Sequence, residues 1–137
     1  MSRFKVAVSS QFGELWRYNI VVVCELCSAN GERIEYKSAE SIVAPVGSNL
    51  DSAPTGYSVD RALNIESGEG DNINLLVYVV PHTLPSVDDI SMTNPFPLVV
   101  KVEREGEQIL SRTFDINQWS GDNIALERVG GIAKSER

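Results

Sequence analysis

The sequence has little of the chemistry on which enzyme sites and metal centres depend. Its 137 residues include only one histidine, two cysteines and 7% aromatic residues. It contains no GxSxG nucleophile motif, no phosphate-cradling glycine loop and no dinucleotide-binding fingerprint. We therefore expect a protein that is not an enzyme, in which His82 is a partly buried, hydrogen-bonding residue rather than a ligand.

The two cysteines form one CxxC pair, Cys24 and Cys27. Residues three apart on a strand point to opposite faces, so this pair cannot easily form a disulfide. A zinc site would need more ligands than two thiols and one histidine provide. We expect Cys24 to lie in the core and Cys27 to be a surface thiol.

Positive charge is scarce as well, because 12 Lys and Arg stand against 19 Asp and Glu, which leaves a net charge of −7. This balance disfavours binding to nucleic-acid phosphates or to anionic lipid. No apolar run approaches the roughly 18 residues that a transmembrane helix needs, and the N-terminus has no signal-peptide core. We expect a cytoplasmic protein, unless a leader has been cleaved from it, that binds no nucleic acid and reaches a membrane only through calcium.

What the sequence does contain is a repeated alternation of apolar and polar residues, which is the pattern of half-buried strands. The runs are Phe4–Ser9, Leu15–Cys27, Ile34–Val43, Val59–Glu66, Asn72–Val80, Phe96–Arg104, Gln108–Ile116 and Ile124–Val129. We predict a single all-β domain over residues 1–129 and a polar, frayed tail over residues 130–137. The expected architecture is one antiparallel β-sandwich of about eight strands, with a barrel as the alternative. It resembles C2-like and immunoglobulin-like sandwiches in general terms.

The apolar pattern also predicts the register of the first hairpin, between the second and third runs. A two-residue Asn30-Gly31 loop would pair Leu26 with Glu35 and set an apolar stripe against a polar one. A three-residue loop over Ala29–Gly31 pairs Leu26 with Ile34 instead. We predict the three-residue loop, with Gly31 in the left-handed conformation.

The same comparison applies to the hairpin between the sixth and seventh runs. A three-residue loop over Arg104–Gly106 pairs Val100 with Leu110, apolar against apolar. We predict this loop, with Gly106 in the left-handed position.

Alternating strand direction sorts the connections into two ends of the sandwich. One end receives the short turns Ala29–Gly31, Ser67–Asp71 and Arg104–Gly106. The other end receives Ser10–Glu14, Ala44–Tyr57, Pro81–Pro95 and Asn117–Asp122. Long loops held together on a rigid scaffold are where such folds usually place binding residues. We predict that binding residues gather at this long-loop end.

Several side chains at the long-loop end suit contact with another protein. Four of them are unusually apolar for a loop, and Trp119 and Phe96 lie nearby in the predicted topology. The candidates for partner binding are Leu84, Val87, Ile90, Met92 and Trp119, with Phe96 as a further contact. Trp119 has the alternative role of plugging the end of the sandwich. We predict a non-catalytic interaction module that binds a protein partner, or forms a homo-oligomer, through this end or an edge strand.

Four aspartates of the same end support an alternative function. Calcium takes six to eight oxygen ligands, and carboxylates from several loops can supply some of them. The candidates are Asp51, Asp88, Asp89 and Asp122, although no DxDxDG loop occurs. The alternative is a calcium-dependent lipid- or carbohydrate-binding module with Trp119 as a platform. The leading expectation is that the protein has no cofactor and that these carboxylates are solvated.

Overall fold

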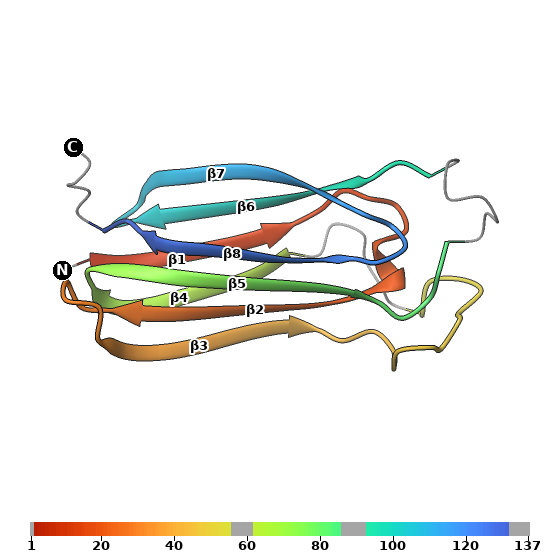
Figure 1. Cartoon of the computed structure of the whole chain (residues 1–137), viewed down its shortest axis with the longest axis horizontal. Helices are drawn as coiled ribbons and strands as arrows, with labels where there is room; N and C mark the ends of the chain where they lie inside the picture. The colour runs from red at the N-terminus through yellow and green to blue at the C-terminus, as the bar shows by residue number, and fades with distance from the viewer. Residues whose placement is uncertain (1, 56–61, 86–92, 132–137) are drawn as a thin grey trace.

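The computed structural model describes residues 2–55, 62–85 and 93–131. Eight strands and one short 3-10 turn follow one another along the chain (Figure 1). Their bounds are β1 Ser2–Ser9, η1 Leu15–Arg17, β2 Tyr18–Cys27, β3 Arg33–Ser41, β4 Ala62–Gly70, β5 Asn72–Pro81, β6 Phe96–Arg104, β7 Glu107–Ile116 and β8 Asp122–Val129. None of the described helical residues forms a segment long and apolar enough to cross a bilayer.

The strands form two antiparallel sheets, in the orders β4-β1-β6-β7 and β3-β2-β5-β8. The sheets pack face to face and do not close into a barrel, so the predicted β-sandwich is confirmed. Successive strands along the chain run in opposite directions, and the connections therefore divide between two ends as predicted (Figure 1). Ser2 at the start of β1 and Val129 at the end of β8 both lie at the short-turn end.

The core lies between the sheets and is built from alternate residues of the inner strands. On β2 these are the even-numbered residues from Tyr18 to Leu26, which are all buried as the alternation predicts. The other sheet contributes Phe4, Val6 and Val8 from β1 and Phe96, Leu98, Val100 and Val102 from β6. Both inner faces are aliphatic and aromatic, and this is why the two sheets stay together.

The second strand starts later than predicted. Residues Leu15–Arg17 form the 3-10 turn η1, and β2 begins at Tyr18. Arg17 was expected on the exposed face of the strand, but it is buried. Its guanidinium group finds polar partners at the long-loop end, which are described below.

The predicted register of the first hairpin is wrong by one residue. Leu26 pairs with Glu35, because the turn extends over Ser28–Glu32 and the register shifts between Leu26 and Cys27. A shift of one residue turns every side chain of β3 to the opposite face. Ile34 and Tyr36 therefore point away from the core and are 49% and 55% exposed.

The physical reason for this register lies in the other sheet. Glu35 and Lys37 point inward and bond the free edge of β4. The Gly68 N–H donates to Glu35 Oε1 at 2.8 Å, and Lys37 Nζ donates to the Glu66 carbonyl at 2.8 Å. Polar side chains on the inner face of β3 thus satisfy backbone groups that would otherwise lack strand partners. Gly31 has a φ of 90°, so its predicted left-handed conformation is confirmed.

The second hairpin also differs from its predicted register. Its loop has two residues, Glu105 and Gly106, both with positive φ, and Val102 rather than Val100 pairs with Leu110. The difference is two residues, so each side chain of β7 keeps its predicted face. Gly106 has a φ of 82°, and its left-handed conformation is confirmed.

The connection from β4 to β5 is shorter than the predicted turn Ser67–Asp71. The strand β4 continues to Gly70, and Asp71 is the only residue before β5. A Cβ atom on Gly70 would lie 2.4 Å from Leu26 Cδ1, so the close approach of β4 to β2 requires glycine here. Predicted strand residues 59–61 and tail residues 132–137 lie outside the described residues.

Candidate functional site

His82 organises the described part of the long-loop end. Its Nε2 lies 2.7 Å from the Trp16 carbonyl oxygen, and its Nδ1 lies 2.7 Å from Thr83 Oγ1. The carbonyl accepts only, so Nε2 carries the proton and Nδ1 accepts from the threonine hydroxyl. Thr83 Oγ1 in turn accepts the Leu50 N–H at 2.9 Å. Through these bonds the buried imidazole links three connections of the chain.

Arg17 also joins two of these connections at the long-loop end. Its Nε donates to Glu14 Oε1 at 2.5 Å, and its Nη1 donates to the Leu84 carbonyl at 2.6 Å. Its guanidinium also lies 4.5 Å from the centre of the Trp16 ring. A buried guanidinium needs such partners, and these contacts hold the loops in place.

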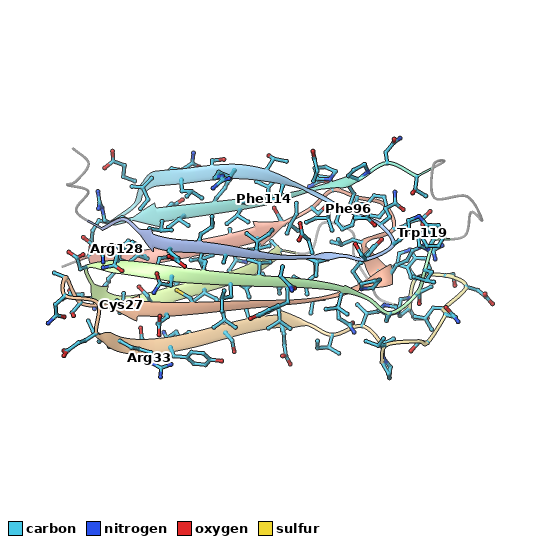
Figure 2. The ribbon with its side chains drawn as sticks, in the orientation of Figure 1. Cys27, Arg33, Phe96, Phe114, Trp119 and Arg128 are labelled. Carbon is cyan, nitrogen blue, oxygen red and sulfur yellow. The ribbon has the colours of Figure 1, made fainter. Side chains whose placement is uncertain are left out.

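The predicted contact residues do not all share one surface. Leu84 is exposed, whereas Trp119 is half-buried, with its Nε1 donating to Thr93 Oγ1 at 2.9 Å. Phe96 is buried, with its ring stacked on Phe12 at 4.5 Å between centroids. Figure 2 shows Trp119 and Phe96 toward the long-loop end. The remaining candidates, Val87, Ile90 and Met92, lie outside the described residues.

The calcium candidates are only partly described. Asp51 and Asp122 are exposed, and Asp122 Oδ1 accepts the Asn123 N–H at 2.8 Å. Asp88 and Asp89 lie outside the described residues. Within residues 2–55, 62–85 and 93–131, no group of three or more His, Cys, Asp or Glu side chains could hold a metal ion. The calcium site therefore stays a prediction.

Two of the groups with altered pKa values, Cys24 and Tyr18, belong to the core. Burial raises the pKa of the Cys24 thiol to about 11 and raises the pKa of the Tyr18 phenol as well. The Tyr18 hydroxyl donates to the Gln118 carbonyl at 2.6 Å. Both groups stay protonated at neutral pH, so neither supplies a nucleophile there.

The structure also corrects the expectation for Cys27. Both cysteines are free thiols, but Cys27 is only 2% exposed and is not a surface thiol. It lies on the outer side of β2, under Asn74, whose amide nitrogen is 3.7 Å from Cys27 Sγ. Burial and the neighbouring Glu25 carboxylate raise the pKa of Cys27.

A second surface, which the sequence reasoning missed, lies on the outer face of the β3-β2-β5-β8 sheet. The outward residues of β5 are apolar, with Leu76, Tyr78 and Val80 between 36% and 39% exposed. Leu76 pairs across the sheet with Val23 and Ala125, and Tyr78 pairs with Val21. We call this surface the apolar face, and its members are Val21, Val23, Ile34, Tyr36, Leu76, Tyr78, Val80 and Ala125.

The outer face of the other sheet is mainly polar. Its outward residues include Lys5, Asn64, Glu66, Lys101, Ser111, Thr113 and Asp115, with Ala7 and Val99 between them. One sheet of a sandwich normally turns such a polar face to solvent. The contrast between the two outer faces marks the apolar face as the unusual one.

At the short-turn end, the apolar face leads into a hollow of about 340 Å³. Leu76 and Ala125 line it on the apolar side, and Asn74, Glu127 and Arg128 line it on the polar side. Figure 2 shows Cys27, Arg33 and Arg128 toward this end of the molecule. The hollow is large enough for one large side chain.

A signal for the apolar face was present in the sequence. Val21 and Val23 occupy odd positions of β2, where the alternation calls for polar residues, and Leu76, Tyr78 and Val80 alternate with the core residues of β5. Over Val21–Val23 and Leu76–Val80, both strands are thus apolar on both faces. Such a run indicates a strand covered on both sides, and no second layer of this chain covers it within the described residues.

Comparisons with known proteins give little further information. No family model matches the chain, and no curated protein matches it. A crystal structure of a DUF4425 family protein from Bacteroides ovatus is similar, with 11% sequence identity and a TM-score of 0.46, over 91% of this chain and 94% of that one. A likeness this distant carries no argument about function.

Proposed function

We propose that this protein is a non-catalytic interaction module that binds a protein partner through the apolar face. The supporting observation is the group of exposed aliphatic and tyrosine side chains on β3 and β5, opposite a polar outer face on the other sheet. Contiguous apolar surface of this kind, bordered by polar residues, is typical of a protein interface.

The charges at the margin of the apolar face favour a basic partner. Glu40, Asp122 and Glu127 are exposed around it and outnumber the exposed Arg128, and the Arg33 side chain already lies 3.7 Å from Glu25. A complementary surface would carry apolar residues at its centre and lysine or arginine at its margin. The same carboxylates would repel an anionic membrane.

The predicted roles of the long-loop end remain part of the proposal as secondary contacts. Leu84 is exposed there, but His82 and Arg17 are committed to internal bonds. The calcium-dependent alternative and the C2-like or immunoglobulin-like analogy also remain proposals, as does a cytoplasmic location. The apolar face is preferred because its exposed residues lie on strands rather than loops, where a contact surface is already preorganised.

Affinity capture with matched variants tests the proposal. Tyr78→Glu places a charge at the centre of the apolar face, and Thr113→Glu places the same charge on the opposite outer face. Both positions are exposed, so both variants should fold. The wild type and Thr113→Glu should both capture the partner protein, whereas Tyr78→Glu should not. That partner should then bind the purified wild type with an affinity that falls as the salt concentration rises. Equal capture by all three forms would contradict the proposal.

A further inference from the structure

The sandwich has four strand edges, and the edge of β4 is already bonded from within the chain. The edges belong to β3 and β8 in one sheet and to β4 and β7 in the other. Lys37 Nζ donates to the Glu66 carbonyl, and Glu35 accepts the Gly68 N–H, each at 2.8 Å. These bonds satisfy part of the β4 edge without a further strand.

The edges of β7 and β8 carry irregularities that discourage strand pairing. The register of β8 shifts where it meets Ile73 and Leu75, and Arg128 has a φ of 53°. The register of β7 shifts where it meets Val102 and Glu103. Bulges of this kind twist an edge away from an incoming strand.

The edge of β3 is regular, and its two inward charges, Glu35 and Lys37, already bond the edge of β4. The strand contains no proline, and the only shift in its pairing with β2 lies at its first residue, Arg33. Within the described residues, β3 pairs with β2 alone. Ile34 and Tyr36 beside this edge are about half exposed. An extended edge with exposed apolar side chains is a template for another strand.

We infer that two copies of the chain pair through β3, antiparallel, about a twofold axis beside Tyr36. The two β3-β2-β5-β8 sheets then form one continuous sheet. In this register Tyr36 faces Tyr36 of the other copy, and Ile34 faces Ser38. On the inner face Glu35 lies opposite Lys37 of the other copy, and this contact occurs twice because of the symmetry.

Charge complementarity and the length of paired strand together select this register among those that a twofold axis allows. The axis makes one residue face itself, and centring it on Lys37 or on Glu35 opposes like charges. Centring it on Ser38 sets Lys37 opposite Ala39 and creates no charge pair. Among the registers that pair at least seven residues of β3, which are those centred on Tyr36, Lys37 and Ser38, only the Tyr36 register opposes unlike charges. Its Glu35–Lys37 pairs stabilise antiparallel strands.

This inference extends the proposed function but uses a separate surface. Pairing through the β3 edge brings the two apolar faces onto one continuous sheet, with Ile34 and Tyr36 of each copy at the junction. The row inward from Tyr36 passes through Glu25 and Asn74. The self-association concerns the edge, whereas the bound partner covers the face. Variants at the edge and at the centre of the face therefore distinguish the failure of one proposal from the failure of the other.

Sedimentation equilibrium of the full chain tests the inference, because it reports both mass and dissociation constant. The wild type should have the mass of two chains. In the double variant Ile34→Glu, Ser38→Glu, the carboxylate at position 34 of each copy faces the carboxylate at position 38 of the other. This repulsion, which occurs twice, should raise the dissociation constant of the dimer at least about tenfold. Combining Ile34→Lys with Ser38→Glu opposes unlike charges in this register and should restore the dimer. Both side chains are exposed, so the fold should tolerate either pair of changes.

Two further variants identify other outcomes. Tyr78→Glu should leave the mass unchanged, and a monomeric Tyr78→Glu would show that two faces pack together, which overturns the edge pairing. Tyr36→Cys should form an interchain disulfide under mild oxidation, since the native cysteines are buried, whereas Lys101→Cys should not. A monomeric wild type would overturn the inference. So would a monomeric Ile34→Lys, Ser38→Glu double variant if the Tyr36→Cys disulfide also fails to form.

Discussion

The Nε2 atom of His82 lies 2.7 Å from the carbonyl oxygen of Trp16, and this contact joins the end of β5 to the turn before β2. It is buried, and it is the central bond of a chain that also includes Thr83 and the Leu50 N–H. The single histidine of the protein therefore has a structural role at the long-loop end.

Replacing His82 by alanine should destabilise the protein. The Trp16 carbonyl and the Thr83 hydroxyl would both lose a buried partner, so we expect the free energy of unfolding to fall by about 1–3 kcal/mol. Urea unfolding measures the change, and Gln11→Ala is an exposed control at the same end. A loss no larger than that of the control would show that the bond contributes little.

The stability of the protein should decrease in alkaline solution because of Cys24. Its pKa rises from 9.0 to about 11 on folding, so the unfolded chain loses the thiol proton first as pH rises. The thiol's contribution is therefore intact below pH 9 and is lost progressively between pH 9 and about 11. Its maximum is about 3 kcal/mol. Urea unfolding across this range should show a steeper decline for the wild type than for Cys24→Val. Identical slopes would exclude Cys24 as the cause.

Gly121→Ala should be among the most damaging single substitutions. Gly121 has a φ of 69°, and a Cβ atom there would lie 1.9 Å from the Val79 carbonyl oxygen, so strand β5 would have to move. We expect a loss of about 3 kcal/mol or more in the free energy of unfolding. Gly13→Ala is the matched control, because nothing lies within 4 Å of its added Cβ atom. Similar melting temperatures for the two variants would contradict this packing.

A thermal melt in EDTA and in millimolar calcium tests the alternative function. We expect the same melting temperature in both, since the exposed Asp51 and Asp122 belong to no described cluster of metal-binding residues. Calcium at a hundred times its Kd would instead add about 2.7 kcal/mol, or several degrees at this size. Such a shift, lost when Asp88 and Asp89 are both replaced by alanine, would favour the calcium-dependent module.

The number of strands and the two ends of the sandwich could be predicted because both depend on local alternation. The direction in which β3 faces could not. Its apolar residues Ile34 and Tyr36 suggested a core position, but the partners of Glu35 and Lys37 are backbone groups of β4, in the other sheet. No local pattern contains that information, and tertiary bonds decided the register.

The candidate site shows the same limit. The internal role of His82 followed from its rarity and its place after a strand, but its partners come from η1 and from its neighbour Thr83. The apolar face, by contrast, was visible in the sequence as apolar residues on both sides of β2 and β5. Alternation alone does not distinguish such a face, because it assigns each apolar strand residue to the core.

The strand directions have a practical consequence for attaching the molecule to something else. Because β1 begins and β8 ends at the short-turn end, a tether or a neighbouring domain joined near Ser2 or Gly131 would hold the sandwich from that side. The long loops would then point away from the attachment, and the apolar face would lie alongside the axis of the tether. Display on a surface or fusion to a reporter can thus use either end of the described chain without covering the long loops.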